Sequence, residues 1–198
     1  MNMISDNTFD EDFIFNEEEA NMLYLKEANP EDLEKEFEFI TNTPEEENGF
    51  TNPAFGCSRE EFEHKILPGY LNAAKGVGLK EGWVPETEFF LWEDDRIVGL
   101  FRIRHYLTEA LANGAGHIGY GIRKECRGKG YASEGLRMAV EQAWKLIREE
   151  EIYLSVRKDN PGSIQVQKKN GAYIHHEDEK EFYTRIRKSA LETGLLKD

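Results

Sequence analysis

The sequence predicts a mixed α/β fold in which helices flank a mostly antiparallel sheet. Two runs of aromatic and β-branched residues, 88–92 and 97–105, are separated by a polar link of hairpin length at residues 93–96. Further along, a strand, a long helix and another strand follow one another within residues 116–156. A crossover of this kind requires parallel neighbours. We therefore expect a central mixed sheet that includes one parallel strand pair.

The beginning of the chain predicts a strand and then a helix. Residues 22–26 can form the strand, and Asn29 followed by Pro30 is typical of a helix start, with acidic residues near the positive end of the helix dipole. The next segment, residues 42–55, is rich in Pro, Asn, Gly and Glu, and predicts an irregular connection.

A second helix is predicted after this connection. Ser58 and Glu61 have the spacing of a capping box, in which each side chain satisfies a backbone N–H group of the first turn. Pro68 lacks a backbone N–H group, so we expect it to kink or end this helix.

The second half of the chain predicts a regular alternation of strands and helices. Apolar residues of the long helix recur at three- and four-residue spacing, which places them on one face and predicts core packing. Gly171 stops the shorter helix that follows. The expected elements are a strand at 116–122, a helix at 133–148, a strand at 152–156, a helix at 163–170, and strands at 173–175 and 182–186.

Composition limits the class of protein. The chain has 198 residues, which predicts a single domain over residues 21–198 after an acidic, mobile extension at residues 1–20. A formal charge of −14 argues against a nucleic-acid partner; its field would favour cationic substrates, and solubility alone is the alternative explanation of the acidic surface. No apolar run is long enough to cross a membrane, and no signal peptide is evident, so we expect a cytoplasmic protein without a membrane partner. Two distant cysteines and an adjacent pair of histidines predict no metal site.

The segment from residue 117 to residue 132 carries the clearest chemical signal. It runs from a strand through a basic, glycine-rich turn into the long helix. Gly128 and Gly130 lack side chains, so backbone N–H groups can approach a ligand at the positive end of the helix dipole. Four cations gather there in an otherwise acidic chain: Arg123, Lys124, Arg127 and Lys129. The pattern favours a phosphate ligand, with a surface turn that needs its glycines for geometry alone as the alternative.

The string Arg127-Gly128-Lys129-Gly130-Tyr131-Ala132 resembles the Arg/Gln-x-x-Gly-x-Gly/Ala signature of the GNAT acetyltransferases, and Asn160 to Ser163 is similar to their Asn-x-x-Ser/Ala helix. Residues 83–132 also resemble a bacterial subgroup of predicted acetyltransferases. The resemblance implies the GNAT acyl-CoA N-acyltransferase fold, in which the parallel strand pair is splayed, and acetyl-CoA as cosubstrate. It implies cofactor-binding roles for Gly121, Ile122, Arg127, Gly128, Lys129, Gly130, Tyr131, Ala132 and Asn160.

The catalytic residues are less clearly indicated. Many family members carry a tyrosine seven residues after the Asn, as general acid toward the CoA thiolate, but this chain has Gln167 there. His117 and Tyr120, on the strand that lines the family's active site, are the candidate catalytic residues, and strand alternation places them on opposite faces. The resemblance implies direct attack by the amine, without a covalent enzyme intermediate.

These patterns predict an N-acetyltransferase that acts on a primary amine of an unidentified small molecule or protein. A non-catalytic acyl-CoA-binding or regulatory module is the alternative, because Gln167 cannot supply a titrating proton. A third reading is an interaction protein that uses the acidic N-terminal segment. A homodimer is compatible with all three, and the sequence does not indicate the acceptor.

Overall fold

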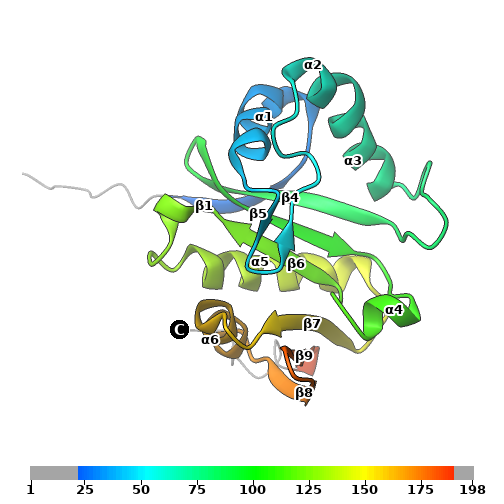
Figure 1. The fold of residues 1–198 in the computed structure, drawn as a ribbon, viewed down its shortest axis with the longest axis vertical. Helices are drawn as coiled ribbons and strands as arrows, with labels where there is room; N and C mark the ends of the chain where they lie inside the picture. The colour runs from blue at the N-terminus through cyan, green and yellow to red at the C-terminus, as the bar shows by residue number, and fades with distance from the viewer. Residues whose placement is uncertain (1–21, 190–198) are drawn as a thin grey trace, which may run out of the picture.

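The computed structural model describes residues 22–189. It consists of antiparallel strands with helices on both sides (Figure 1). The extension expected at residues 1–20 lies outside the described residues. The strands are β1 (Leu23–Glu27), β2 (Glu46–Glu47), β3 (Phe50–Thr51), β4 (Glu86–Glu93), β5 (Arg96–Arg104), β6 (Ile118–Ile122), β7 (Glu151–Arg157), β8 (Tyr173–Glu177) and β9 (Glu181–Arg187). The helices are α1 (Leu33–Asn42), α2 (Arg59–Glu61), α3 (Leu67–Ala74), α4 (Glu109–Ala112), α5 (Tyr131–Leu146) and α6 (Pro161–Lys169).

The strands form two main sheets, with a small hairpin beside them. One sheet has the order β1-β4-β5-β6, the other has the order β7-β9-β8, and β2 pairs with β3. Every ladder within the described chain is antiparallel, so the fold class is as predicted but the expected parallel pair does not form a ladder. Between β6 and β7 the structure has one isolated bridge, Gly116 to Leu154, of the antiparallel type. The two strands are therefore splayed, as the resemblance implies.

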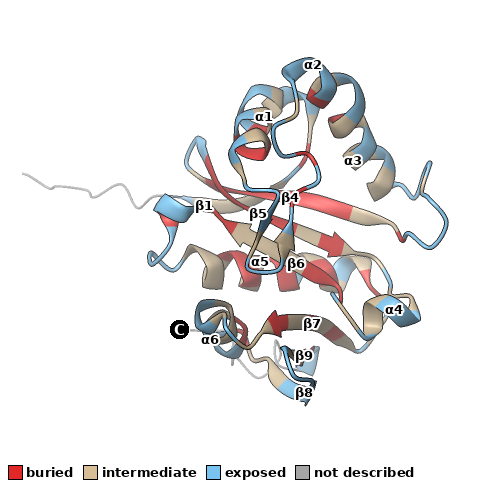
Figure 2. Ribbon diagram, viewed as in Figure 1, coloured by how far each residue is buried: buried red, intermediate tan, exposed pale blue. Residues whose placement is uncertain are grey.

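Two apolar cores lie on the two faces of the four-stranded sheet. Helix α5 covers one face, and its buried side is drawn in red in Figure 2. Phe101 of β5 and Leu136 and Val140 of α5 belong to the same buried cluster. Helices α1 and α3 cover the other face, where Phe39 meets Phe90 edge to face with ring centroids 5.8 Å apart. The second sheet and α6 lie beyond α5 (Figure 1). The predicted apolar face of the long helix is thus confirmed as core.

The predicted helix starts are present. The side-chain oxygen of Asn29 accepts hydrogen bonds from the N–H groups of Glu31 and Asp32, at 3.0 and 3.2 Å. Ser58 Oγ accepts from the N–H group of Glu61 at 3.1 Å. Each cap satisfies donors that a helix start otherwise leaves without a partner.

Pro68 does not end the second helical segment. A π-helical turn, Phe62–Ile66, precedes it, and α3 continues to Ala74. The wider turn shifts the backbone hydrogen-bonding pattern just before the proline ring, so the missing N–H group is tolerated. Within residues 22–189 no helix has the length and apolarity needed to cross a membrane.

Candidate active site

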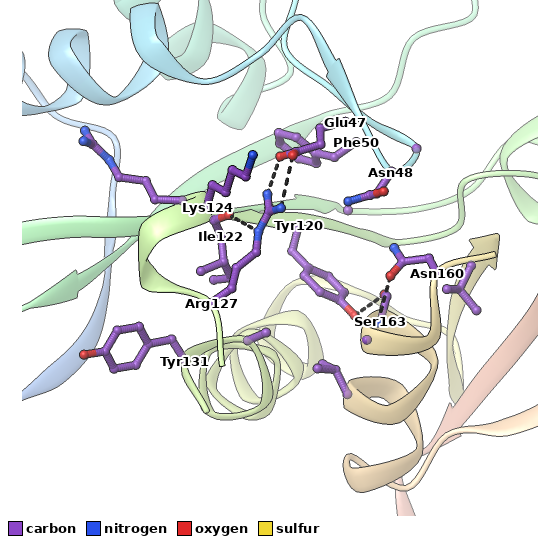
Figure 3. A pocket seen from close by; sticks show the side chains of 18 of the residues that line it. Glu47, Asn48, Phe50, Tyr120, Ile122, Lys124, Arg127, Tyr131, Asn160 and Ser163 are labelled. Carbon is purple, nitrogen blue, oxygen red and sulfur yellow. Dashed lines mark hydrogen bonds and ion pairs between the residues drawn. The ribbon is translucent and has the colours of Figure 1, made fainter. Parts of the chain in front are cut away.

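A cleft of about 820 Å³ lies where β6 and β7 separate. Its walls are β6 with the loop that leads into α5, the end of β7 with the start of α6, and the β2–β3 hairpin (Figure 3). Seven of the lining residues are Arg or Lys and three are Glu. The cleft is therefore basic in a protein whose formal charge is −14, and this local sign favours anionic ligands.

The glycine-rich loop forms a cradle of backbone N–H groups at the start of α5. Gly128 and Gly130 have φ angles of +80° and +86°, and a Cβ atom on either would lie in open space. Gly130 is the N-cap of α5 and supplies no side-chain hydrogen bond. Within the described chain, the N–H groups of residues 128–132 meet no acceptor. Such a row of donors at the positive end of a 16-residue helix fits a phosphate group.

Arg127 is held between the cleft edge and the hairpin. Its Nε donates to the carbonyl oxygen of Ile122 at 3.0 Å, and its two terminal nitrogens meet the two carboxylate oxygens of Glu47, one of them at 3.1 Å (Figure 3). The hydrogen bond from Arg127 lowers the pKa of Glu47, so that carboxylate stays ionised. Glu47 thus occupies both terminal nitrogens of the Arg127 guanidinium.

The hairpin also places an aromatic ring over β6. A Cβ atom on Gly121 would lie 3.2 Å from Cδ1 of Phe50, closer than ordinary van der Waals contact. Glycine at residue 121 is what allows the ring to approach the strand. The hairpin is therefore in contact with the middle of the cleft as well as with its charged end.

On the opposite wall, α6 is joined to β6 by a chain of hydrogen bonds. Asn160 caps α6, with its side-chain oxygen accepting from the N–H group of Ser163 at 3.1 Å. Ser163 Oγ is in turn hydrogen-bonded to the hydroxyl of Tyr120 at 2.6 Å (Figure 3). The Tyr120 ring stacks on Phe101 with centroids 5.4 Å apart, so the hydroxyl is fixed in position. Burial raises the pKa of Tyr120 to about 12, which keeps the phenol protonated.

Comparison with known proteins identifies the family of this chain. The model of the acetyltransferase (GNAT) domain matches residues 22–173, which is most of the chain. The chain belongs to the GNAT acetyltransferase family. The match includes the glycine-rich loop, Tyr120 and Asn160.

Solved structures share the GNAT fold of this chain. A structure described as a probable acetyltransferase has a TM-score of 0.61 at 18% identity, over 84% of this chain and 93% of that one. RimJ from Mycobacterium smegmatis, solved in complex with a CoA disulfide, has a TM-score of 0.61 at 18% identity, over 85% and 83%. The ribosomal-protein-S5-alanine acetyltransferase from Vibrio fischeri has a TM-score of 0.59 at 16% identity, over 83% and 92%.

The GNAT cleft brings together most of the residues that the sequence singles out. Of the nine cofactor-binding residues that the resemblance implies, all except Lys129 line the cleft. The Lys129 ammonium lies 5.7 Å from the ring centroid of Tyr131 instead. Tyr120 lines the cleft as well, whereas His117 is not among the lining residues. No cluster of metal-ligating side chains occurs in the part of the GNAT domain that the structure describes.

His117 lies in the core, at the point where β6 and β7 touch. Its side chain is 0% exposed, and its Nδ1 accepts a hydrogen bond from the N–H group of Tyr153 at 2.9 Å. Its Nε2 is 3.6 Å from a carboxylate oxygen of Glu149. Burial outweighs Glu149 and lowers the pKa of His117 to about 4. A neutral, enclosed imidazole is positioned to hold two strands together and is not placed to touch an acceptor in the cleft.

Gln167 stands where many family members have a tyrosine, and its side chain has a structural role. Its side chain donates to the carbonyl oxygen of Ser155 at 3.2 Å and accepts from the hydroxyl of Thr184 at 2.7 Å. Gln167 is 2% exposed and is not among the cleft-lining residues. It therefore anchors α6 to β7 and β9, while Tyr120 brings a phenol to the same helix from β6.

The β2–β3 hairpin was missed at the level of sequence. Residues 42–55 were expected to be irregular, yet they supply Glu47 and Phe50 to the cleft. Asn48 and Gly49 have φ angles of +54° and +88°, as the central residues of a tight hairpin turn require. The Asn-Gly dipeptide is the signal that predicts this hairpin.

The pKa of His117 gives a test of its role. Its value is about 4 in the folded protein against about 6.5 unfolded, so the unfolded chain binds the extra proton first and stability falls as pH drops through this window. We expect this one group to lower the unfolding free energy as the pH falls from 7 to 5. His117→Asn keeps an acceptor for the Tyr153 N–H group and removes the titration. Urea denaturation at the two pH values should therefore show a smaller loss for the variant, and an equal loss in both proteins would contradict the structural role.

Proposed function

We propose that this GNAT domain is an N-acetyltransferase that moves the acetyl group of acetyl-CoA directly to a primary amine. The observation that carries the proposal is the row of N–H groups at residues 128–132, which has no acceptor in the described chain and opens at the start of α5. A diphosphate offers several oxygens to such a row. The CoA disulfide named in the RimJ complex supports the same class of ligand.

Other residues of the cleft would hold the rest of the cosubstrate. The N–H group of Arg123 donates to Val98 in β5, so strand alternation turns the backbone of Ile122 toward the open edge of β6. The hydrogen bond from Arg127 to the Ile122 carbonyl agrees with that direction. We assign the amide groups of the pantetheine arm to this edge, opposite Asn160.

Acetyl transfer has three chemical requirements. A C–N bond forms, the C–S bond of the thioester breaks and releases the CoA thiolate, and the nitrogen loses two protons, one from its ammonium form before attack and one after the C–N bond has formed. Acetyl-CoA supplies the activated acyl group, and the N–H group of Ile122 is directed so that it can polarise its carbonyl oxygen. An alkylamine has a pKa near ~10.4 and must react in its neutral form. We assign both protons of the amine to water, and the CoA thiolate takes one proton from the solvent to leave as the free thiol.

Tyr120 is the residue that we assign to the leaving sulfur. A thiol has a pKa near ~8.5, well below the value of about 12 for Tyr120, so complete proton transfer from the phenol to the thiolate is unfavourable. The phenol stabilises the developing thiolate by donating a hydrogen bond and keeps its proton. Ser163 fixes the direction of the hydroxyl.

A non-catalytic acyl-CoA-binding module is the second candidate, because the buried Gln167 offers no titrating proton. Tyr120 lies on the cleft wall and reaches α6 from β6, which favours the enzyme. Binding of acetyl-CoA without turnover of any amine is the result that would favour the module. The acceptor, small molecule or protein, and a cytoplasmic location remain predictions from the sequence.

Isothermal titration with acetyl-CoA tests the cofactor assignment. We expect the wild-type protein to bind and Gly130→Tyr to lose binding, because its side chain would enter the open space in front of the N–H row. Gly78→Tyr is the matched control: Gly78 has a φ angle of +69°, open space around a Cβ atom, and a position outside the cleft. Absence of binding by the wild type would contradict the function while leaving the family assignment intact.

The contact between Glu47 and Arg127 predicts competition with the cosubstrate. Glu47→Gln should raise the affinity for acetyl-CoA about two- to fivefold, since a half-exposed ion pair is worth up to about 1 kcal/mol and the variant releases the guanidinium. Glu46→Gln is the control on the same hairpin, because Glu46 is more exposed and lies 3.9 Å from Arg157. Equal dissociation constants for Glu47→Gln and the wild type in calorimetry would show that the carboxylate does not compete.

Removal of the phenol should affect chemistry and not binding. Tyr120→Phe is expected to lower kcat about 10²-fold for any accepted amine, as loss of one transition-state hydrogen-bond donor does, with the dissociation constant of acetyl-CoA within about twofold of wild type. Tyr106→Phe is the control, since Tyr106 is exposed and lies outside the cleft. The rate is followed by the release of free CoA thiol. An unchanged kcat would remove Tyr120 from the mechanism.

A further inference from the structure

Two arginines of β5 line the end of the cleft that is farthest from the glycine-rich loop. Arg102 pairs in register with Gly119, and the N–H group of Arg104 donates to the carbonyl oxygen of His117. Both therefore stand beside the start of β6, whereas the loop follows its end at Ile122. Three residues of strand, or about 10 Å, separate Gly119 from Ile122. The cations beside the glycine-rich loop would bind a diphosphate there. Arg102 and Arg104 lie too far from the loop to contribute to that binding.

Arg102 is fixed in place by its neighbours. Its Nε donates to Glu88 at 2.6 Å and lies 3.7 Å from Glu86. The guanidinium carbon lies 5.7 Å from the ring centroid of Phe50, and the side chain is only 12% exposed. Its two terminal nitrogens meet no hydrogen-bond acceptor among residues 22–189. A rigid guanidinium thus presents unused donors at the cleft wall.

The strand opposite leaves these donors accessible. Register partners direct their side chains to the same face of a sheet, so a side chain at residue 119 would stand beside the guanidinium of Arg102. Glycine at residue 119 leaves that space open. A Cβ atom there would have only Phe50 within 4.0 Å, so the phenyl ring lines one side of this space.

The charges around Arg102 select the kind of anion. Arg102 and Arg104 face Glu86 and Glu88, so the four side chains sum to zero. Burial alone would lower the pKa of Arg102, but Glu88 and Glu86 outweigh it and raise the pKa, which keeps the guanidinium charged. A dianion such as phosphate would be repelled by both glutamates. A planar monoanion matches the guanidinium fork and adds only one negative charge.

We propose that Arg102 binds a carboxylate carried by the acceptor, so that the substrate is an amino acid or a related amine with a free carboxyl group. The proposal rests on the proposed acetyl transfer and names the substrate class of that same cleft. It differs from the cationic acceptor that the overall charge of −14 favours, because the acidic surface and the basic cleft have opposite signs.

Matched amine pairs test this proposal. Each pair contains a carboxylate and its uncharged amide: glycine and glycinamide, β-alanine and its amide, 4-aminobutyrate and its amide, lysine and lysinamide. We expect kcat/KM to be about 10- to 100-fold higher for the carboxylate in at least one pair, the range expected for hydrogen bonds to a charged group. The proposal would be overturned if, in every pair, kcat/KM for the amide equalled or exceeded kcat/KM for the carboxylate. A higher kcat/KM for phosphoethanolamine than for all of the carboxylates would overturn it too.

Variants of one strand assign the preference to Arg102. Arg102→Lys keeps a positive charge beside Glu88 and removes the bidentate fork. The ratio of kcat/KM for the carboxylate to kcat/KM for its amide should therefore fall toward one, mainly because KM for the carboxylate rises. Arg96→Lys is the matched control on β5, because Arg96 is half-exposed, pairs with Glu125 and does not line the cleft. An unchanged preference in Arg102→Lys would overturn the assignment. Circular dichroism and acetyl-CoA affinity equal to wild type establish that each variant is folded.

Binding measurements distinguish a failure of this proposal from a failure of the proposed function. N-acetylglycine, N-acetyl-4-aminobutyrate and their amides are titrated into the protein with and without CoA, and heat is measured. Carboxylate binding that depends on Arg102, together with absent acetyl-CoA binding, would refute the transferase while supporting the anion site. Acetyl-CoA binding with no carboxylate bound or turned over in preference to its amide would refute the anion site alone.

Discussion

The separation of β6 from β7 is the constraint on which the rest of the site depends. The two strands meet at Gly116 and His117, where the His117 N–H group donates to the carbonyl oxygen of Tyr153 at 2.6 Å and the imidazole accepts from the Tyr153 N–H group. A Cβ atom on Gly116 would lie 2.2 Å from that carbonyl oxygen, and its φ angle is +67°, so only glycine fits. The contact fixes one end of the strand pair and leaves the other end open for a ligand.

An open strand edge has to be covered, since unpaired N–H and C=O groups are costly when buried and attract other strands when exposed. Side chains cover much of this edge. Arg127 takes the carbonyl oxygen of Ile122, Phe50 packs on Gly121, and Glu47 neutralises Arg127. The loop and the hairpin thus cover this edge together: Arg127 satisfies the Ile122 carbonyl oxygen, and the hairpin places the Glu47 carboxylate and the Phe50 ring over the strand.

Local signals were enough to predict much of this molecule. The spacing of apolar residues gave α5, the turn chemistry gave the β4–β5 hairpin, and the Asn160 cap and the glycine-rich loop were visible as short motifs. The burial of His117 could not be predicted in this way, because a histidine in a strand has the same sequence signal in a core as in a cleft. The contact of Glu47 with Arg127 joins residues 80 positions apart, and no local pattern contains it.

The register of the β4–β5 hairpin was equally beyond local reasoning, and it decides which side chains face each other. A regular ladder continued from the Glu93–Arg96 pair would place Glu88 opposite Phe101. The irregularity between Leu91 and Trp92 shifts the pairing by one residue and puts Glu88 opposite Arg102. A shift of one residue exchanges the two faces of a strand relative to its partner. The bulge is therefore what brings the glutamate to the arginine and fixes the guanidinium at the cleft wall.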